Sequence, residues 1–318
     1  MQTPDLVTIV IPTYNRETLV PRAIASVLAQ SYPNIEVMVV DDGSRDHSTE
    51  AVLAIAESDS RVRLVRHTSN YGQNAALNTG ICFCTGTYVG FCDSDDTLLP
   101  DFVEKFVSKF QSDSELGAVY SRKFVKLGHR EPVVAVPFTL EGHVYPQTLA
   151  QGHLSHMGTI MVKRECFKRT RVFDINFTNH QDDDFCFLVA KHYKVGLIPE
   201  ALAIEFNEGL ADRVTDNRLD YAQGFRRFII KHADEILELA GPDAMIHHLN
   251  KSARLFLEVG DPHAATRLLT DCTDLFNKTV QSGVAPLEAV ASIVPNRSVL
   301  REQLIANVER CNAILTRK

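Results

Sequence analysis

The stretch TYVGFCDSDD, residues 87 to 96, runs from apolar residues directly into three aspartates. A short apolar run bounded by turn residues is typical of a buried strand. Ligands of a parallel sheet bind at the carboxyl ends of its strands, where the loops converge. Carboxylates at that position indicate a functional site, whereas the plainer alternative is a solvated acidic turn in which Asp96 caps the next helix.

The residues on either side of this stretch repeat the same pattern. Four strands are expected, at residues 6–12, 35–41, 62–66 and 87–93. Between them, apolar residues such as Leu19, Ala23 and Val27 recur on one helical stripe, which predicts helices that cover the sheet. This alternation predicts βα units that feed a mostly parallel sheet, so the expected fold class is α/β.

The next part of the chain is less regular. Residues 117–127 and 158–163 are expected to be strands. The segment 128–156 is rich in Gly, Pro and His and is expected to be loop-like. We therefore expect the first domain to cover residues 1–215.

Residues 216–318 show helical periodicity only. Ala222, Phe225 and Ile229 are spaced by three or four residues, and a Gly-Asp-Pro break within 253–276 predicts a helical hairpin. The same spacing returns near the end of the chain, at Leu300, Leu304, Val308 and Cys311. We expect an α-helical C-terminal region, which either braces the first domain or serves acceptor docking or self-association into a homo-oligomer.

The composition excludes several classes of function. The 318 residues are 45% hydrophobic and 23% charged, with a net charge of −7, which argues against a protein that binds nucleic-acid phosphates through a basic face. No stretch is long and apolar enough to span a membrane, and the sequence is compatible with peripheral contact at the inner face of a membrane. The seven cysteines lack paired spacing and predict reduced core thiols in a cytoplasmic protein.

Three polar motifs follow three of the expected strands. They are PTYNR (12–16), DDGSRD (41–46) and DSDD (93–96). The chain has neither G-x-G-x-x-G after the first strand nor a P-loop, so phosphate charge must be met in another way. Asp93 and Asp95 can place hard oxygens near one Mg²⁺ or Mn²⁺ ion, and such an ion would neutralise a diphosphate.

Four ordered blocks of the sequence resemble the family 2 glycosyltransferases of the GT-A fold. The blocks are VTIVIPTYNR, SVLAQSYPNIEVMVVDDGSRDHS, NYGQNAALNTGICFCTGTYVGFCDSDDTLLPDF and FDINFTNHQDDDFCFLVAKHYKV. The resemblance covers roughly residues 6–215. It implies a GT-A-type, mostly parallel sheet flanked by helices, and an inverting enzyme that uses a nucleotide-sugar donor.

The resemblance also implies roles for matching residues. Asp42 would bond the polar edge of the nucleotide base, and Asn70 would contact the donor. Asp95 would be the direct metal ligand, Asp93 would lie nearer the ribose or the metal, and Asp96 would touch the donor sugar. The remaining expected donor-binding residues are Pro12, Thr13, Tyr14, Asn15 and Ser94.

A later acidic block would carry the general base of the family. In QDDDF (181–185), Asp182 aligns with that base, and Gln181 stands where the family usually has Glu. Asp183 and Asp184 could compete for the role, and three adjacent carboxylates should raise one another's pKa. The plainer interpretation of the block is a cap at the start of the next helix.

One departure from the family pattern is a missing histidine, while two other histidines are candidates for the acceptor side. The family often completes its metal site with a C-terminal His, whereas this chain offers Asn207 and Glu208. His153 and His156 precede the strand at 158–163 and could face the acceptor, although an isolated loop His is usually only a solvated side chain.

The resulting hypothesis is transfer of a sugar from a nucleoside diphosphate, UDP above all, to a hydroxyl of a glycan or lipid-linked acceptor. One alternative is an inactive module that binds a sugar nucleotide or glycan, which Gln181 and the missing His favour. Another is a phosphohydrolase, because DSDDT (93–97) resembles a D-x-D-x-T loop in which Asp93 is the nucleophile.

Overall fold

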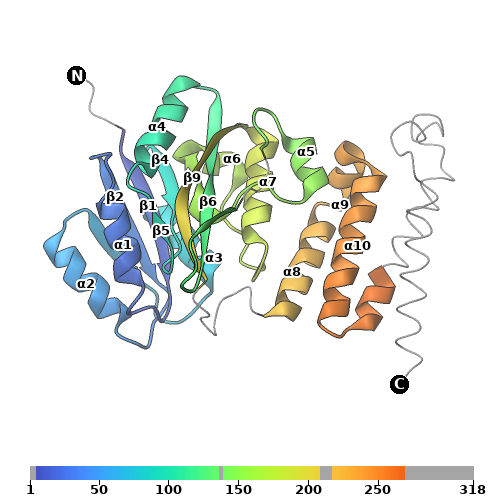
Figure 1. Ribbon diagram of the computed structural model, residues 1–318, viewed down its shortest axis with the longest axis horizontal. Coiled ribbons are helices and arrows are strands. Elements are labelled where there is room, and N and C mark those ends of the chain that lie inside the picture. Colours follow the sequence, from blue (N-terminus) through green and yellow to red (C-terminus); the bar gives the residue numbers. More distant parts are fainter. Residues whose placement is uncertain (1–4, 136–138, 208–216, 269–318) are drawn as a thin grey trace. The chain divides into compact units, whose positions relative to one another are not determined.

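The computed structural model of the chain describes residues 5–135, 139–207 and 217–268. Within these ranges it forms a nine-stranded sheet in the order β3-β2-β1-β4-β8-β6-β9-β5, with β7 paired to β6 (Figure 1). The strands are β1 Val7–Thr13, β2 Ile35–Asp41, β3 Val62–Arg66, β4 Tyr88–Phe91, β5 Thr97–Leu98, β6 Leu116–Leu127, β7 Val133–Ala135, β8 Ile160–Lys163 and β9 Lys194–Asn207.

The first four strands run parallel and confirm the βα pattern of the sequence. Val7 of β1 pairs with Ile35 of β2 on one side and with Tyr88 of β4 on the other. Every residue of β1 and β2 is buried, which explains why both strands are nearly continuous apolar runs. The sheet is mixed beyond β4, because β8 is antiparallel to both β4 and β6, while β6 and β9 are parallel.

Helices cover the sheet of this part of the chain. They are α1 Val20–Leu28, α2 Ser48–Ser58, α3 Gln73–Phe83, α4 Phe102–Ser112, α5 Tyr145–Gln151, α6 Phe167–Thr170 and α7 Gln181–His192, with single 3₁₀ turns η1 Met157–Thr159 and η2 Arg164–Cys166. Ile9 and Ile11 of β1 belong to the core that α1 and α4 also enter. Val10 points to the other face, toward α3, as the alternation of a strand requires.

Helix α3 packs very closely on β1 because of one glycine. A Cβ built on Gly80 would lie 2.3 Å from Cγ1 of Val10. The helix begins after Gly72, whose φ of 93° lies in the region that favours glycine. The Gly-rich block around residues 70–80 is therefore a packing feature that sets α3 directly beneath the carboxyl ends of the strands.

Two expectations from the sequence need correction. The segment 128–156 was expected to be loop-like, but it contains β7 and α5, which are only three and seven residues long and give too little periodicity to recognise. Of the cysteines expected in the core, Cys82 is exposed, while Cys84, Cys92, Cys166 and Cys186 are buried free thiols. Cys272 and Cys311 lie outside the described residues.

The chain divides into two compact units, and residues 149–152 group with the second one. The second unit contains α8 Arg218–Lys231, α9 Ala233–Glu235, the π-helical turn η4 Ile236–Ala240 and α10 Pro242–Glu258, and residues 262–268 are also helical. The expected domain boundary at 215, the end of the expected hairpin and the repeat at Leu300 to Cys311 lie outside the described residues. Within those residues, no helix has both the length and the apolar character that crossing a bilayer requires.

Within the second unit, a buried histidine holds residues 149–152. Nε2 of His248 donates a hydrogen bond to the carbonyl oxygen of Leu149 at 2.7 Å. A Cβ on Gly152 would lie 2.7 Å from the same imidazole. The ring of Phe225, on α8, lies edge-on to it. One imidazole thus fixes a short piece of chain that precedes the α8–α10 helices by more than sixty residues in the sequence.

Candidate active site

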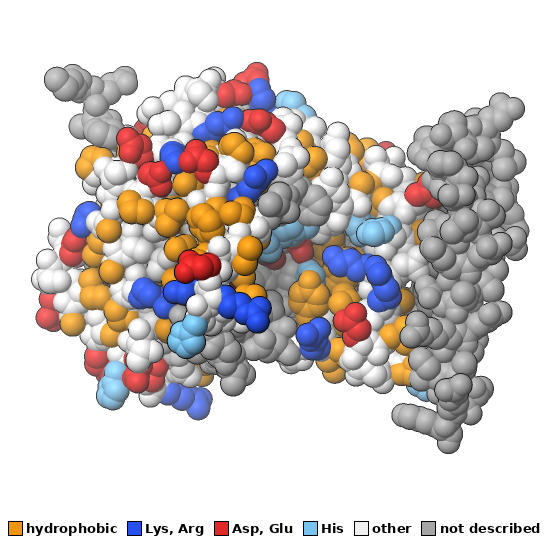
Figure 2. Space-filling view, in the orientation of Figure 1, with side chains coloured by type: hydrophobic (Ala, Val, Ile, Leu, Met, Phe, Trp, Pro, Cys, Tyr) orange, Lys and Arg blue, Asp and Glu red, His pale blue; other side chains and the backbone are white. Residues whose placement is uncertain are grey.

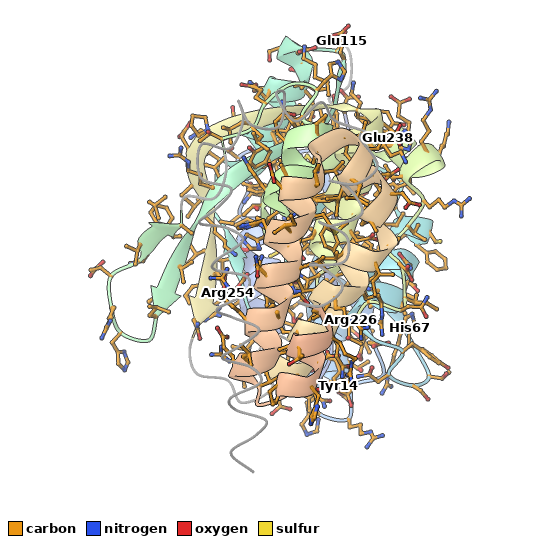
Figure 3. The ribbon with its side chains drawn as sticks, turned by 90° about the vertical axis from the view of Figure 1, so that its right-hand side faces the viewer. Tyr14, His67, Glu115, Arg226, Glu238 and Arg254 are labelled. Carbon is orange, nitrogen blue, oxygen red and sulfur yellow. The ribbon has the colours of Figure 1, made fainter. Side chains whose placement is uncertain are left out.

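The polar motifs found in the sequence lie at one end of the sheet. Figure 3 shows Tyr14, after β1, and His67, after β3, at this end, and Glu115, which precedes β6, at the opposite end. Charged side chains of both signs are interspersed with apolar ones on the face drawn in Figure 2. The candidate site is therefore sought among the side chains that meet at the carboxyl ends of the strands, where a parallel sheet binds its ligands.

A cleft of about 510 Å³ opens beside the ends of β1, β2 and β3. Tyr14 and Asn70, two of the expected donor-binding residues, line it together with Gly43, Ser44, Arg45, Arg66, His67, Thr68 and Ser69. The arginines supply the positive charge that the sequence analysis required for a phosphate in the absence of a P-loop. Neither arginine was predicted, because an arginine after a strand carries no signal of its own.

Asp42 is buried beneath this cleft, and its carboxylate already has partners. Its oxygens accept hydrogen bonds from the backbone N–H groups of Tyr71, at 2.9 and 3.1 Å, and of Gly72, at 2.7 Å. Nδ1 of His67 lies 2.7 Å from Oδ1. Asp42 therefore shapes the loop that carries Asn70, which is a structural role that the sequence analysis did not predict.

The residues after β1 are also tied to the loop after β2. Asn15 accepts a hydrogen bond from the backbone of Arg45 at 2.9 Å, and its own N–H donates to Ser44 Oγ at 3.0 Å. Asn15 has a φ of 52°, a conformation that asparagine tolerates better than most residues. Pro12 and Thr13 are buried at the end of the strand. Of the PTYN residues, Tyr14 is thus the one that lines the cleft.

The acidic loop after β4 is held in place from three sides. Gln73, the first residue of α3, donates to Asp93 Oδ1 at 3.0 Å. The carbonyl oxygen of Asp95 accepts a hydrogen bond from Arg22 of α1 at 2.6 Å. Asp96 Oδ1 accepts one from the backbone of Phe206 in β9 at 3.1 Å. Ser94 is buried, whereas the three aspartates are half-buried.

The carboxylates of the acidic loop lie close enough to raise one another's pKa, and Asp182, the expected base, adds to the effect on Asp93. Burial and the charge of Asp95 raise the pKa of Asp93 to about 7. Lys123 opposes this rise in pKa, while Asp182 and Glu205 contribute to it. Burial and the charges of Asp93 and Asp95 raise the pKa of Asp96 to about 8. The structure therefore brings Asp182 into the electrostatic range of the acidic loop.

The donor set of the acidic loop fits a hard divalent cation. Burial and, after it, the charges of neighbouring aspartates raise the pKa values of Asp93 and Asp96, and a bound cation would offset the repulsion between these carboxylates. Among the residues that the structure describes, no group of three or more His, Cys, Asp or Glu side chains is arranged as a complete metal site. Asn207 is exposed at the end of β9, and Glu208 lies outside the described residues.

The three aspartates at the start of α7 have three different environments. Both oxygens of Asp183 have partners, since His153 Nδ1 lies against Oδ1 and His180 Nδ1 lies 2.7 Å from Oδ2. Burial alone would raise the pKa of Asp183, but the two histidines hold it well below its usual value. Asp184 is 2% exposed. Asp182 keeps 22% of its side chain exposed, which makes it the accessible carboxylate of the three.

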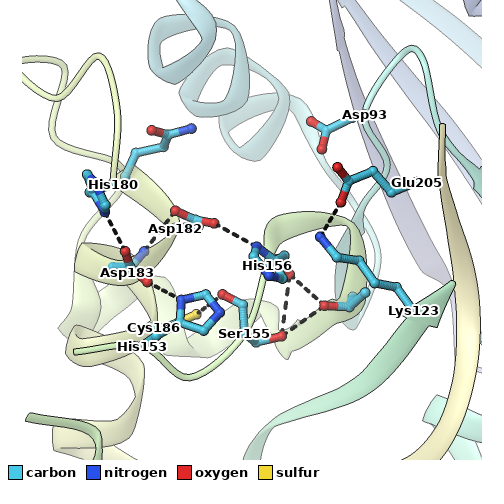
Figure 4. A network of polar contacts seen from close by, with 12 residues as sticks. Asp93, Lys123, His153, Ser155, His156, His180, Asp182, Asp183, Cys186 and Glu205 are labelled. Atoms are coloured by element: carbon cyan, nitrogen blue, oxygen red, sulfur yellow. Dashed lines mark hydrogen bonds and ion pairs between the residues drawn. The ribbon is translucent and has the colours of Figure 1, made fainter. Parts of the chain in front are cut away.

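His156, which the sequence analysis considered for the acceptor side, also reaches this region, together with Lys123 and Glu205, which it did not mention. Nδ1 of His156 lies 3.4 Å from Asp182 Oδ2. Lys123 of β6 and Glu205 of β9 form an ion pair of 2.5 Å, and both act on the pKa of Asp93 (Figure 4). Lys123 and Glu205 come from strands that are paired over their whole length, and nothing in the sequence marks them.

Helix α3 connects the acidic loop to the segment that leads into α7. Asn74 donates to the carbonyl oxygens of Asp174 and Phe177 at 2.9 and 2.7 Å. Asn78 both donates to and accepts from the backbone of Phe173, at 2.8 Å each. Asn74 is itself buried, so its amide serves the packing of the chain. Its neighbour Gln73 contacts Asp93, so one helix positions both groups of carboxylates.

Comparison with other proteins agrees with this arrangement. The family described as Glycosyl transferase family 2 matches residues 8–170. An uncharacterized glycosyltransferase of Haemophilus influenzae is 34% identical over 186 residues, which are 58% of this chain and 70% of that protein. The Streptococcus pneumoniae glycosyltransferase GlyA is 39% identical over 124 residues, 38% of this chain but only 18% of that longer protein.

Solved structures share the fold at low sequence identity. S. aureus TarS, solved in complex with UDP-GlcNAc, has a TM-score of 0.68 at 16% identity, over 98% of this chain and 92% of that one. A mannosyltransferase from Pyrobaculum calidifontis, solved with GDP-Man and Mn²⁺, has a TM-score of 0.55 at 21% identity, over 97% and 87% of the two chains. The expected GT-A-type sheet is thereby confirmed, and the chain is a glycosyltransferase that belongs to family 2.

Proposed function

We propose that the protein transfers a sugar from a nucleoside-diphosphate sugar, a UDP-sugar in the first instance, to a hydroxyl of a glycan or lipid-linked acceptor. Asp182 acts as the general base, and the anomeric carbon is inverted in a single displacement. The observation that carries this proposal is the position of Asp182, which is accessible and lies within the electrostatic range of Asp93. A base and a diphosphate-binding loop must face the same sugar for such a reaction.

The transfer forms one bond, breaks one bond and moves one proton. The acceptor oxygen attacks the anomeric carbon while the bond from that carbon to the diphosphate oxygen breaks. The acceptor proton goes to Asp182, and the nucleoside diphosphate leaves with the electron pair of the broken bond. A sugar hydroxyl is too weak an acid to ionise alone at neutral pH, and a positioned base typically contributes about 10² to 10⁴ in rate.

The donor would lie along the strand ends. Its base would occupy the cleft that Tyr14 and Asn70 line. Pro12, Thr13, Asn15 and Asp42 would support the residues that line this cleft, since Asn15 and Asp42 hydrogen-bond to the loops that carry them. Asp93 and Asp95, flanked by Ser94 and Asp96, would hold Mn²⁺ or Mg²⁺. When bound, that ion neutralises charge on the diphosphate and so makes it a better leaving group. The Mn²⁺ seen in the related fold supports this choice of metal.

A donor panel tests the proposal. The protein is incubated with Mn²⁺ and, separately, UDP-GlcNAc, UDP-glucose, UDP-galactose and GDP-mannose, and release of nucleoside diphosphate is measured. Release that disappears in Asp182→Asn supports the proposal. Binding of donors without release would mean an inactive binding module, and release of phosphate from p-nitrophenyl phosphate would mean a phosphohydrolase. UDP-GlcNAc is the first donor to test, because TarS shares the fold and was solved with it.

The helical region from residue 216 onward has its own proposed role. We assign transfer to the first domain, residues 1–215, and a bracing role to the helices. Acceptor docking and assembly of a homo-oligomer are the alternatives. Measuring the mass of the protein in solution separates bracing from assembly, and a variant that transfers normally but fails on a large acceptor would indicate docking.

A further inference from the structure

The connection between α5 and β8 brings His156 to the expected base. Nδ1 of His156 lies 3.4 Å from Oδ2 of Asp182, and 40% of the His156 side chain is exposed (Figure 4). The imidazole of His153 is 4.5 Å away, between ring centres. His153 is already committed to Asp183, so His156 is the histidine of this connection that faces Asp182.

The backbone around His156 is held without help from its imidazole. The carbonyl oxygen of His156 accepts hydrogen bonds from Thr159, from both its backbone N–H and its hydroxyl, at 3.0 Å each. Ser155 Oγ lies 3.0 Å from Thr159 Oγ1. The carbonyl oxygen of Ser155 accepts from the thiol of Cys186 in α7 at 3.6 Å. Removing the imidazole therefore leaves the connection anchored to α7.

Asp182, by contrast, has little to fix its side chain. Oδ1 accepts a hydrogen bond from the N–H of Asp183, its own neighbour in the helix, at 3.1 Å. That contact tethers one oxygen but leaves the second free to turn, since the group is partly exposed. His156 is the partner of the second oxygen. A base must be held within hydrogen-bond reach of the proton that it abstracts, so the orientation of this carboxylate matters for the rate.

We propose that His156 is a positioning residue for the transfer reaction, and that its imidazole holds the Asp182 carboxylate in the orientation that accepts the acceptor proton. This inference rests on the proposed function of Asp182. Nδ1 is the ring nitrogen directed at Asp182, so we expect His156 to act through this carboxylate. Its loss should lower kcat and leave the KM for the donor unchanged.

Two substitutions at this position give a matched kinetic test, read as UDP release from UDP-GlcNAc with Mn²⁺. We expect His156→Ala to lower kcat by about 10- to 100-fold, as for a misplaced catalytic group, with a donor KM within about twofold of the wild type. His156→Asn keeps an N–H donor near the position of Nδ1 and should stay within about threefold of wild-type kcat. His129→Ala, an exposed histidine after β6, is the control and should behave as the wild type.

The outcomes separate this inference from the proposed function. Wild-type kcat in His156→Ala, a raised donor KM in His156→Ala, or equal losses of kcat in the Ala and Asn variants would each overturn the positioning role. Full UDP release by Asp182→Asn would instead overturn the role of Asp182 as the base, whatever His156 does.

Discussion

Asp182 and Asp183 are adjacent in the sequence, but their environments suit them to different roles. Asp183 is buried with both oxygens engaged by His153 and His180, so it can neither reach a substrate nor release its charge easily. Asp182 is partly exposed, and its Oδ2 lies 3.4 Å from Nδ1 of His156, so it is less tightly held than Asp183. A carboxylate that is fully bonded stabilises the fold, whereas one with a free lone pair can take a proton.

The first prediction concerns Asp182. We expect Asp182→Asn to lower turnover by about 10² to 10⁴, the contribution of a positioned general base, with donor affinity unchanged. Turnover and nucleotide binding are measured separately, by product release and calorimetry. Asp234→Asn, an exposed position on α9, is the control for the loss of one negative charge. A loss of donor affinity equal to the loss of turnover would contradict the prediction.

The second prediction is a pH dependence at Asp183. Its pKa is held below the value of about 3.9 found in unfolded chains, so ionised Asp183 adds stability that is present above that pH and is lost as the pH falls through the folded pKa. Asp183→Asn lacks this contribution. The difference in Tm between wild type and Asp183→Asn should therefore shrink as the pH falls from 5.5 to 3. A difference that stays constant or widens would show that the charge contributes no stability.

The third prediction concerns Asp42. Substitution by Ala removes the acceptor for the N–H groups of Tyr71 and Gly72. Leaving buried donors without a partner costs about 1 to 3 kcal/mol, so we expect Asp42→Ala to lower the free energy of unfolding by about that amount. Denaturation in urea measures it. The loop that carries Asn70 should loosen as well, which would weaken nucleotide binding, and an unchanged nucleotide affinity would exclude a role of this loop in the donor site.

At the scale of elements, α3 organises the site. It contacts Asp93 through Gln73, the segment before α7 through Asn74 and Asn78, and β1 through Gly80. A helix can hold two groups of carboxylates at a fixed separation because its own backbone hydrogen bonds make it rigid. The close approach of α3 to β1 is therefore part of the site as well as part of the core.

The fourth prediction tests that approach. Gly80→Ala places a Cβ 2.3 Å from Cγ1 of Val10, and overpacking of this kind typically costs about 1 to 3 kcal/mol. Val10→Ala removes the opposing methyl groups, so the double variant should recover part of the loss relative to the sum of the two single variants. Urea denaturation of the four proteins measures the coupling. Simple additivity would mean that the two side chains do not meet.

At the scale of the whole molecule, one short segment belongs to the second unit although the residues before and after it in the sequence belong to the first. Residues 149–152 group with the helices of the second unit, and His248 contacts both Leu149 and Gly152. The next residue along the chain is His153, which binds Asp183. Gly152, which contacts His248, is therefore followed directly in the sequence by His153, which binds Asp183, the neighbour of the expected base.

The fifth prediction concerns this passage. His248→Ala removes a buried hydrogen bond to Leu149 and leaves a cavity beside Gly152. We expect limited proteolysis to cut near residues 149–152 in this variant and not in the wild type, because the segment loses its main anchor. His247→Ala, at the exposed neighbouring position on α10, is the matched control. Equal protection of both variants would show that other contacts hold the segment.

The sequence by itself determined the α/β class, the parallel strands β1 to β4 and the polar residues that follow them. These features are local, since strands and helices differ in the period of their apolar residues and the carboxyl end of a strand is marked by the polar residue that follows it. It also placed Asp93, Asp95 and Asp182 among the candidates through the resemblance to a family. That resemblance named Asp182 as the base but kept Asp183 and Asp184 as competitors, because the three share one sequence environment.

Only the tertiary structure decided which polar groups are already bonded and which are accessible. His153 satisfies Asp183 across 30 positions, Tyr71 and Gly72 satisfy Asp42 across 29 and 30, and Lys123 meets Glu205 across paired strands. Burial and hydrogen bonding at such separations depend on how the elements pack, and no local period encodes that packing. The approach of His156 to Asp182 is of the same kind, because it brings together the connection between α5 and β8 and the start of helix α7.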